Sequence, residues 1–397
     1  MTKRRISANY VFPIVGEPIK NGFVDFDENG VVTGIGQLEG ETESTEFYNG
    51  ILCPGFTNAH CHIELSHLKD KFEEKTGMSG FINQINALRD SAPKEVRLAL
   101  IEEQFEKLYA EGVTAMADIS NCDESFDAKS RSKIYTRTFL EVFGAFPEEA
   151  EEVMTGVKEL ETKAKAMGLD AAPTPHSPYT MSPKLLQLSA AEGLKDGFVS
   201  YHNQESQEEE DLLISGTGAL AENYRGRNMP TPPVTGKPAL LYFIDNLKQV
   251  HPAPFEESIL LIHNTATNEE SVEAALSTFQ NVTWVTCPLS NIFIHDTLAP
   301  YDLLRSKGVR IAIGTDSLSS NHILSMAEEI KCLQAHHPEI PLAEILMWAT
   351  LNGAIALGKG NTFGSFEVGK MPGAVLIDNI DWKNFALTAK SKATRIL

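Results

Sequence analysis

The chain has 397 residues, 42% of them hydrophobic and 22% charged, which is typical of a soluble globular protein with a full core. Its net charge of −20 argues against a nucleic-acid partner, because phosphate binding needs a basic surface. No apolar run reaches the roughly 18 residues of a membrane span, and no apolar segment follows the basic N-terminal residues as in a secretory signal. The five cysteines are scattered, which is typical of a reducing compartment. We therefore expect a cytoplasmic protein that acts on a small molecule, without a nucleic-acid or membrane partner, and leave a homodimer open as its assembly.

The first 54 residues predict short β-strands. The strands lie at 6–11, 22–26 and 31–35, and Asp27-Glu28-Asn29-Gly30 is a hairpin turn signal between the last two. After about residue 362 the chain returns to strand patterns, at 366–377 and 393–397. We expect one small β-sandwich domain that combines residues 1–54 with residues 362–397.

Between residues 55 and 361, short apolar strands alternate with helices. Strand candidates lie at 50–60, 113–119, 134–142, 170–176, 197–202, 258–263, 282–287 and 309–315. Two helices are clear: one follows Pro147 and ends before Gly168, and one runs from about Pro93 to Ala110. Eight strands that alternate with helices over about 300 residues predict an α/β fold, a (β/α)8 barrel of the TIM type.

Two segments are longer than ordinary loops, residues 64–92 and residues 206–238. Each follows a predicted strand at its carboxyl end, where barrel enzymes place their sites. They are candidates for lids or substrate-binding loops. Insertions that serve only oligomer packing are the alternative.

His60 and His62 lie at the end of the first barrel strand. Alternate side chains of a strand share a face, so both imidazoles point the same way. Two imidazoles are half of a zinc-type site, although so short a pattern also arises by chance. Further polar residues end other predicted strands: His176, His202, His263 and Asp316. Because the carboxyl ends of barrel strands meet at one face, we expect these side chains to share a pocket.

Four motifs in this order resemble those of metal-dependent amidohydrolases, in the branch that holds deaminases and chlorohydrolases. They are Pro54-Gly55-Phe56-Thr57-Asn58-Ala59-His60-Cys61-His62, His202-x-x-Glu205, Cys287-Pro288-Leu289-Ser290-Asn291 and Gly314-Thr315-Asp316-Ser317. The resemblance covers nearly all of the chain. It implies a metal-dependent enzyme, and it is much less specific for the substrate.

The resemblance implies a single metal site. Its ligands would be His60, His62, His202 and Asp316, a set that suits Zn²⁺ or, as a second choice, Fe²⁺. Binuclear relatives carry a carbamylated lysine at the end of the fourth strand, where this chain has Thr174 and His176. We therefore expect one divalent ion, which would lower the pKa of a bound water.

The same resemblance implies roles for the neighbouring residues. Asp316 would also receive the proton of the water, Glu205 would pass a proton to a ring nitrogen of the substrate, and His263 would orient the attacked carbon or the tetrahedral oxygen. His176 matches a histidine that contacts the substrate ring in related adenine-nucleoside deaminases. Glu64 is a candidate for binding sugar hydroxyls, or else a partner of a ligand histidine.

Several other polar residues stay open. Arg137 and Glu141 either reach the pocket, with Arg137 as a substrate contact, or form a structural ion pair. Arg225 and Arg227 could hold an anionic end of a substrate, although solvated loop charges are commoner. His322 is undecided. We expect structural roles for the remaining histidines, which are His67, His251, His295, His336 and His337.

The expected activity is that of a hydrolase of C–N bonds other than peptide bonds, which deaminates an amino-substituted heterocycle with release of ammonia. Residues 62–66 and 202–206 resemble enzymes that deaminate aminodeoxyfutalosine, an adenine nucleoside on a route to menaquinone, and we rank this substrate first. Guanine, S-adenosylhomocysteine, a pterin and a chlorotriazine are alternative substrates. A cyclic amidase and a catalytically silent binding protein are alternative functions.

Overall fold

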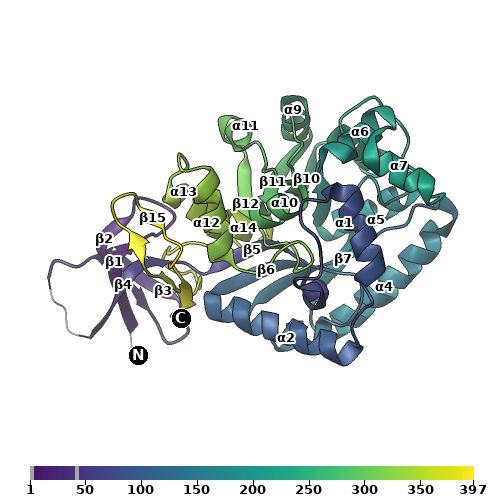
Figure 1. The fold of residues 1–397 in the computed structure, drawn as a ribbon. Helices are drawn as coiled ribbons and strands as arrows, with labels where there is room; N and C mark the ends of the chain where they lie inside the picture. The colour runs from purple at the N-terminus through teal and green to yellow at the C-terminus, as the bar shows by residue number, and fades with distance from the viewer. Residues whose placement is uncertain (1–3, 41–43) are drawn as a thin grey trace.

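The computed structural model describes residues 4–40 and 44–397. Strands from both ends of the chain form one six-stranded sheet, in the order β16-β13-β4-β1-β2-β3. Their bounds are Arg4–Val11 (β1), Ile19–Phe26 (β2), Val32–Gln37 (β3), Thr45–Cys53 (β4), Val375–Ile377 (β13) and Ala393–Arg395 (β16). Ile380–Asp381 (β14) and Ala386–Leu387 (β15) form a separate two-stranded ladder. The first and the last described strands therefore belong to one sheet, at one side of the molecule (Figure 1).

The rest of the chain forms two four-stranded parallel sheets, β5-β6-β7-β8 and β12-β11-β10-β9. The first contains Phe56–Cys61 (β5), Val113–Ser120 (β6), Tyr135–Val142 (β7) and Asp170–Pro175 (β8). The second contains Phe198–Asn203 (β9), Phe255–His263 (β10), Phe279–Thr286 (β11) and Arg310–Ile313 (β12). Every residue of β5 and β6 is buried, as expected of parallel strands that are covered on both faces.

The sequence predicted one strand over 50–60, and the structure divides it in two. β4 ends at Cys53 and joins the terminal sheet, whereas β5 begins at Phe56 in the parallel sheet. Pro54 lies between them and has no backbone N–H to donate to a strand ladder. The chain therefore passes from one sheet to the other at the proline.

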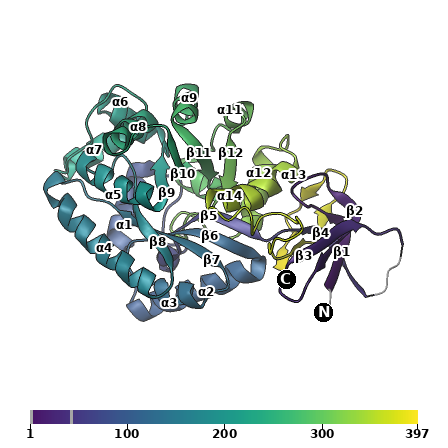
Figure 2. The same ribbon diagram turned by 180° about the vertical axis from the view of Figure 1, so that it is seen from behind.

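Helices lie between the parallel strands and cover them (Figures 1 and 2). The α-helices are Gly77–Leu88 (α1), Lys94–Glu111 (α2), Phe126–Arg131 (α3), Ala150–Ala166 (α4), Pro183–Asp196 (α5), Gln207–Ser215 (α6), Gly218–Gly226 (α7), Ala239–Val250 (α8), Glu269–Thr278 (α9), Pro288–His295 (α10), Tyr301–Ser306 (α11), Met326–His336 (α12), Leu342–Met347 (α13) and Gly353–Ala356 (α14). Short 3-10 turns occupy Ile63–Leu68 (η1) and Pro147–Glu149 (η2), and a π-helical turn (η3) occupies Trp348–Asn352. The helices predicted after Pro93 and after Pro147 are α2 and α4, and no described helix is long and apolar enough to cross a membrane.

The two parallel sheets touch at both pairs of edges. Between β8 and β9, the Ser200 N–H donates to the Thr174 hydroxyl at 2.9 Å. Between β12 and β5, the Thr315 N–H donates to the His60 carbonyl at 2.9 Å. The second contact depends on Gly314, because a Cβ there would lie 2.7 Å from the His60 backbone. The carboxyl ends of strands from both sheets therefore meet at one rim.

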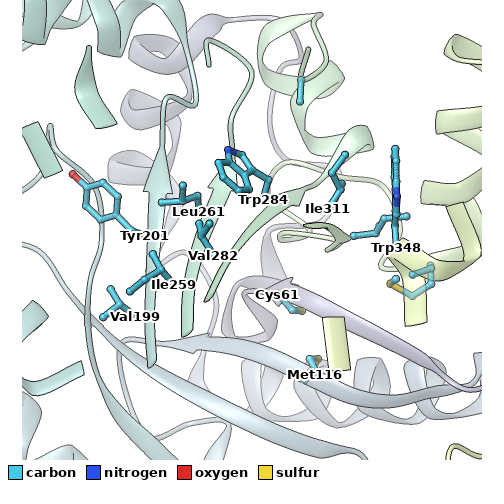
Figure 3. Close-up of a cluster of buried hydrophobic side chains, with 14 of the residues drawn as sticks. Cys61, Met116, Val199, Tyr201, Ile259, Leu261, Val282, Trp284, Ile311 and Trp348 are labelled. Carbon is cyan, nitrogen blue, oxygen red and sulfur yellow. The ribbon is translucent and has the colours of Figure 1, made fainter. Parts of the chain in front are cut away.

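Successive side chains of a parallel strand belong to two different hydrophobic clusters. Ile259 and Leu261 of β10 belong to the main cluster, which faces the helices and includes Trp284 and Tyr201 (Figure 3). Leu260 and Ile262 belong to a second cluster between the two sheets. This period of two is the geometry of a strand with both faces buried. His263 is the last residue of β10 and follows these core residues directly.

Candidate metal and catalytic site

Three imidazoles and one carboxylate converge at the rim where the sheets meet. The Nε2 atoms of His60 and His62 are 3.1 Å apart, and those of His62 and His202 are 3.3 Å apart. Oδ1 of Asp316 lies 3.7 Å from Nε2 of His60 and 3.6 Å from Nε2 of His62. All four side chains are buried. They come from the ends of β5, β9 and β12, which the sequence predicted to share a pocket.

These four donors fit a divalent transition metal. A four-coordinate zinc ion with Zn–N distances of about 2.05 Å places its nitrogen ligands roughly 3.3 Å apart. The measured separations of 3.1 Å and 3.3 Å lie close to that value. Imidazole and carboxylate are also the ligand types that zinc and iron share.

The ligand protonation states agree with this fit. Burial lowers the pKa of His60 and lowers those of His62 and His202 well below their usual value, so all three rings are neutral near pH 7. Nδ1 of His202 lies 3.3 Å from the His176 carbonyl and 3.3 Å from Oε1 of Glu141. A proton on Nδ1 donates to the His176 carbonyl and leaves the Nε2 lone pair for a metal.

The Asp316 carboxylate is held in one orientation. Ser290 and Ser320 each donate a hydroxyl hydrogen bond of 2.6 Å to Oδ2. Burial opposes the negative charge, but contacts with His60 and His62 outweigh burial and hold the pKa of Asp316 well below its usual range. Asp316 is therefore a carboxylate near neutral pH, with Oδ1 directed at the histidines.

Glu205 and His263 lie beside the four-residue cluster. Nε2 of His263 is 3.5 Å from Oε1 of Glu205, and the Tyr179 hydroxyl donates to Oε2 at 3.3 Å. On its other side, His263 donates from Nδ1 to Oδ1 of Asn291 at 2.9 Å. A buried carboxyl and an imidazole are thus fixed next to the candidate metal position, where proton transfer needs them.

A pocket opens over this cluster and encloses about 870 Å³ of empty space, part of it open to solvent. The insertion at 64–92 supplies an apolar wall, made of Leu65, Met78, Phe81, Ile82 and Ile85. His176 also lines the pocket, and burial lowers its pKa to about 4, so a neutral ring faces the pocket.

The structure places two predicted substrate contacts outside the pocket. Glu64 accepts hydrogen bonds from the Asn121 N–H at 3.0 Å and the Ser125 hydroxyl at 2.8 Å, and it does not line the pocket. Its carboxylate instead ties the chain after His62 to the loop that follows β6. Sequence reasoning did not find these partners, because they lie almost 60 residues away.

Arg137 lies near the amino end of β7, at the opposite end of the strand from the pocket. Its guanidinium pairs with Asp170 and Asp196 and packs 4.6 Å from the centre of the Phe198 ring. The prediction of a substrate contact is corrected here: Arg137 forms structural ion pairs, but its partners are Asp170 and Asp196 and not Glu141. Glu141, at the carboxyl end of the same strand, does line the pocket.

Two residues at or beside the site were missed from the sequence. Arg89 follows α1 and lines the pocket, donating to Oδ1 of Asn121 at 2.8 Å. His295, expected to be structural, has its Nε2 atom 3.8 Å from Oε1 of Glu205. Neither carries a local signal, because each reaches the site only through the placement of its helix. His322 forms exposed contacts with Asp70 and Glu74.

Known proteins resemble this chain along most of its length. The model of the amidohydrolase family matches residues 51–395. The chain is 29% identical over 338 residues to the aminodeoxyfutalosine deaminase of Nitratiruptor sp., covering 83% of this chain and 79% of that protein. It is 28% identical over 338 residues to an adenosine deaminase of Helicobacter pylori, covering 82% of this chain and 78% of that protein. These relatives are hydrolases of C–N bonds, as the sequence predicted.

Solved structures show the same fold. The crystal structure of Helicobacter pylori aminofutalosine deaminase in complex with methylthio-coformycin matches with a TM-score of 0.80 and 24% identity, over 99% of this chain and 100% of that one. An adenosine deaminase from Xanthomonas campestris with bound zinc matches with a TM-score of 0.74 and 22% identity, over 94% of this chain and 84% of that one. With the family motifs, the fold and the matched length in agreement, this chain belongs to the amidohydrolase family.

Proposed function

We propose that this protein hydrolytically deaminates an adenosine-like nucleoside, using one divalent metal ion held by His60, His62, His202 and Asp316. The close approach of the His60, His62 and His202 ring nitrogens, with the Asp316 carboxylate beside His60 and His62, is the observation that carries the proposal. Zinc is the first choice for the ion and iron the second. When bound, the metal supplies a water molecule whose pKa falls from about 15.7 toward about 7.

Asp316 and Glu205 carry out the proton transfers in this proposal. Oδ1 of Asp316 accepts a proton from the water, while the bonds from Ser290 and Ser320 to Oδ2 keep the carboxylate from turning away. The pKa of Glu205 is lowered by His263 and His295, which outweigh burial, so it is a carboxylate near neutral pH. Glu205 takes the other proton of the attacking water and passes it to the ring nitrogen next to the attacked carbon, which makes that carbon more electrophilic. Asp316 gives its proton to the amino group, which leaves as ammonia, so both carboxylates return to their starting state.

Two histidines orient the substrate in this proposal. His263, held by Asn291, faces the attacked carbon and the oxygen that forms on it. His176 presents a neutral ring to the heterocycle, with Nδ1 held by the hydroxyls of Ser177 and Thr180 at 2.8 Å and 2.7 Å. The apolar wall of α1 excludes water from the opposite side of the pocket.

For the substrate we propose aminodeoxyfutalosine first, in keeping with the names of the relatives. Adenosine, and methylthioadenosine or S-adenosylhomocysteine, are the second candidates, because deaminases of these nucleosides are also similar to the chain. The apolar wall accommodates a base and an apolar substituent, and Arg89 places one cation at its edge.

The architecture completes the proposal. Hydrogen bonds at both pairs of sheet edges support a single closed (β/α)8 barrel over residues 55–361. Residues 1–54 and 362–397 would form the small accompanying β-domain. A cytoplasmic location and a homodimeric assembly remain predictions.

Ammonia release tests the reaction. The purified protein is assayed with aminodeoxyfutalosine, adenosine, methylthioadenosine, S-adenosylhomocysteine and guanine, and its metal content is measured. We expect turnover of at least one adenine nucleoside and about one transition metal per chain. Silence on every adenine nucleoside would refute the substrate class, and two metals per chain would refute the mononuclear site.

The Glu205→Gln variant tests the mechanism. It should keep its metal and lose roughly 100-fold or more in kcat, because the amide cannot donate a proton as the acid does. Glu222→Gln, on the exposed face of α7, is the matched control and should behave as the wild type. Near-normal activity of Glu205→Gln would show that the assigned role is wrong.

A further inference from the structure

Along its whole length, helix α10 contacts residues that take part in the proposed reaction. Near its start, Ser290 donates to Oδ2 of Asp316 at 2.6 Å. The next residue, Asn291, accepts from Nδ1 of His263 at 2.9 Å. His295 ends the helix four residues later, on the face that Asn291 occupies. Helix α10 thus holds Asp316 through Ser290 and His263 through Asn291. Its third polar side chain, His295, has no assigned role.

His295 is directed at Glu205. Its side chain is 6% exposed, and its Nε2 atom lies 3.8 Å from Oε1 of Glu205. That nitrogen is buried and has no hydrogen-bond partner among the described residues. A buried N–H without a partner is costly, so a neighbouring carboxylate is where it should bond. Catalytic hydrogen bonds are often long without substrate and shorten when the substrate binds.

The other neighbours of Glu205 leave a place for this donor. Oε2 accepts from the Tyr179 hydroxyl, whereas Oε1 faces Nε2 of His263 at 3.5 Å. Because the Asn291 oxygen can only accept, His263 spends a proton on Nδ1, and Nε2 of the neutral ring carries a lone pair. In this tautomer His263 offers no N–H to Oε1, which leaves Oε1 open to another donor.

We propose that His295 is a positioning residue for Glu205. Its Nε2–H donates to Oε1 while Tyr179 holds Oε2, so the carboxyl plane stays aimed at the ring nitrogen that it protonates. His295 itself does not line the pocket and touches no substrate. It belongs to none of the clusters that could hold a metal among the described residues, so it acts through Glu205. This inference rests on the proposed deamination.

Two substitutions of His295 separate a donor role from simple packing. His295→Phe keeps a ring of similar size without the N–H, and His295→Gln restores an N–H near the same place. We expect kcat of His295→Phe to fall about tenfold with KM within twofold, and His295→Gln to recover most of the loss. Metal content and melting temperature report whether each variant is folded.

A double-mutant cycle with Glu205→Gln shows whether His295 acts through Glu205. His295→Phe should cost nothing further on the Glu205→Gln background. The same loss on both backgrounds, an unchanged kcat for His295→Phe, or a His295→Gln as slow as His295→Phe would each overturn the inference. A wild type that deaminates nothing would overturn the proposed function together with it, whereas an active wild type confines the result to His295.

Discussion

Glu208 joins the wall of the pocket to the loop that carries Glu205. Its carboxylate accepts from the backbone N–H groups of Met78 and Ser79, at 3.0 Å and 3.1 Å, and from the Ser79 hydroxyl. These groups begin α1, the helix whose apolar side chains form the pocket wall. A carboxylate at a helix N-terminus satisfies free N–H groups and interacts favourably with the helix dipole.

The Glu208→Ala variant should loosen α1. Loss of a capping group costs about 0.5–2 kcal/mol, and loss of the charge near the dipole about 0.3–1 kcal/mol. If substrate binding has to restore the order of α1, a total of about 2 kcal/mol corresponds to a roughly 30-fold rise in KM. We expect little change in kcat, because Glu208 does not line the pocket. Glu208→Gln keeps one acceptor and should show a rise of only about fivefold.

Steady-state kinetics and hydrogen exchange at the amides of Met78 and Ser79 measure the effect. Glu222→Ala, an exposed glutamate on neighbouring α7, is the control. A Gly77→Ala variant should reproduce the phenotype from the other side, because Gly77 has φ +67° and an added Cβ would overlap the Glu208 carboxylate. If KM and exchange protection in Glu208→Ala match the wild type, α1 is not held by this carboxylate and the reasoning is refuted.

Three further predictions concern stability and the metal. Asp118 is fully buried and pairs with Lys129 at 2.7 Å. Lys129→Met should destabilise the fold by about 3–5 kcal/mol, because it leaves the Asp118 carboxylate buried without a partner. As the control, Lys107→Met removes an exposed ion pair and should change the melting temperature little. A chelator should abolish turnover, and about one equivalent of zinc per chain should restore it, as measured by ammonia release. The pKa of Glu124 is lowered mainly by hydrogen bonds from Arg97, so their pairing stabilises the fold above about pH 4.5 and is lost as pH falls through the lowered value. Glu124→Gln should therefore lower the melting temperature slightly at pH 7, by an amount worth about 0.5 kcal/mol after solvent screening, and not near pH 3.

Local patterns were sufficient for much of the fold. The spacing of apolar residues located the parallel strands, because a strand buried on both faces reads as a continuous apolar run. The one error of division, at residues 50–60, came from reading through Pro54, which separates β4 from β5. The contacts between sheet edges could not be predicted from local patterns, since they join residues such as Thr315 and His60 that are far apart in the chain.

The sequence by itself determined that His60 and His62 share a face, because strand periodicity is a local property. It also marked His202 and Asp316 as ends of strands, and barrel topology implied that such ends meet. Only the tertiary structure decided which polar side chains lie at the site and which partners they bind. Arg137 is at the wrong end of its strand, Glu64 is bound by the loop after β6, and His295 is brought to Glu205 by its helix. Side-chain partners depend on packing between distant segments, which no local pattern records.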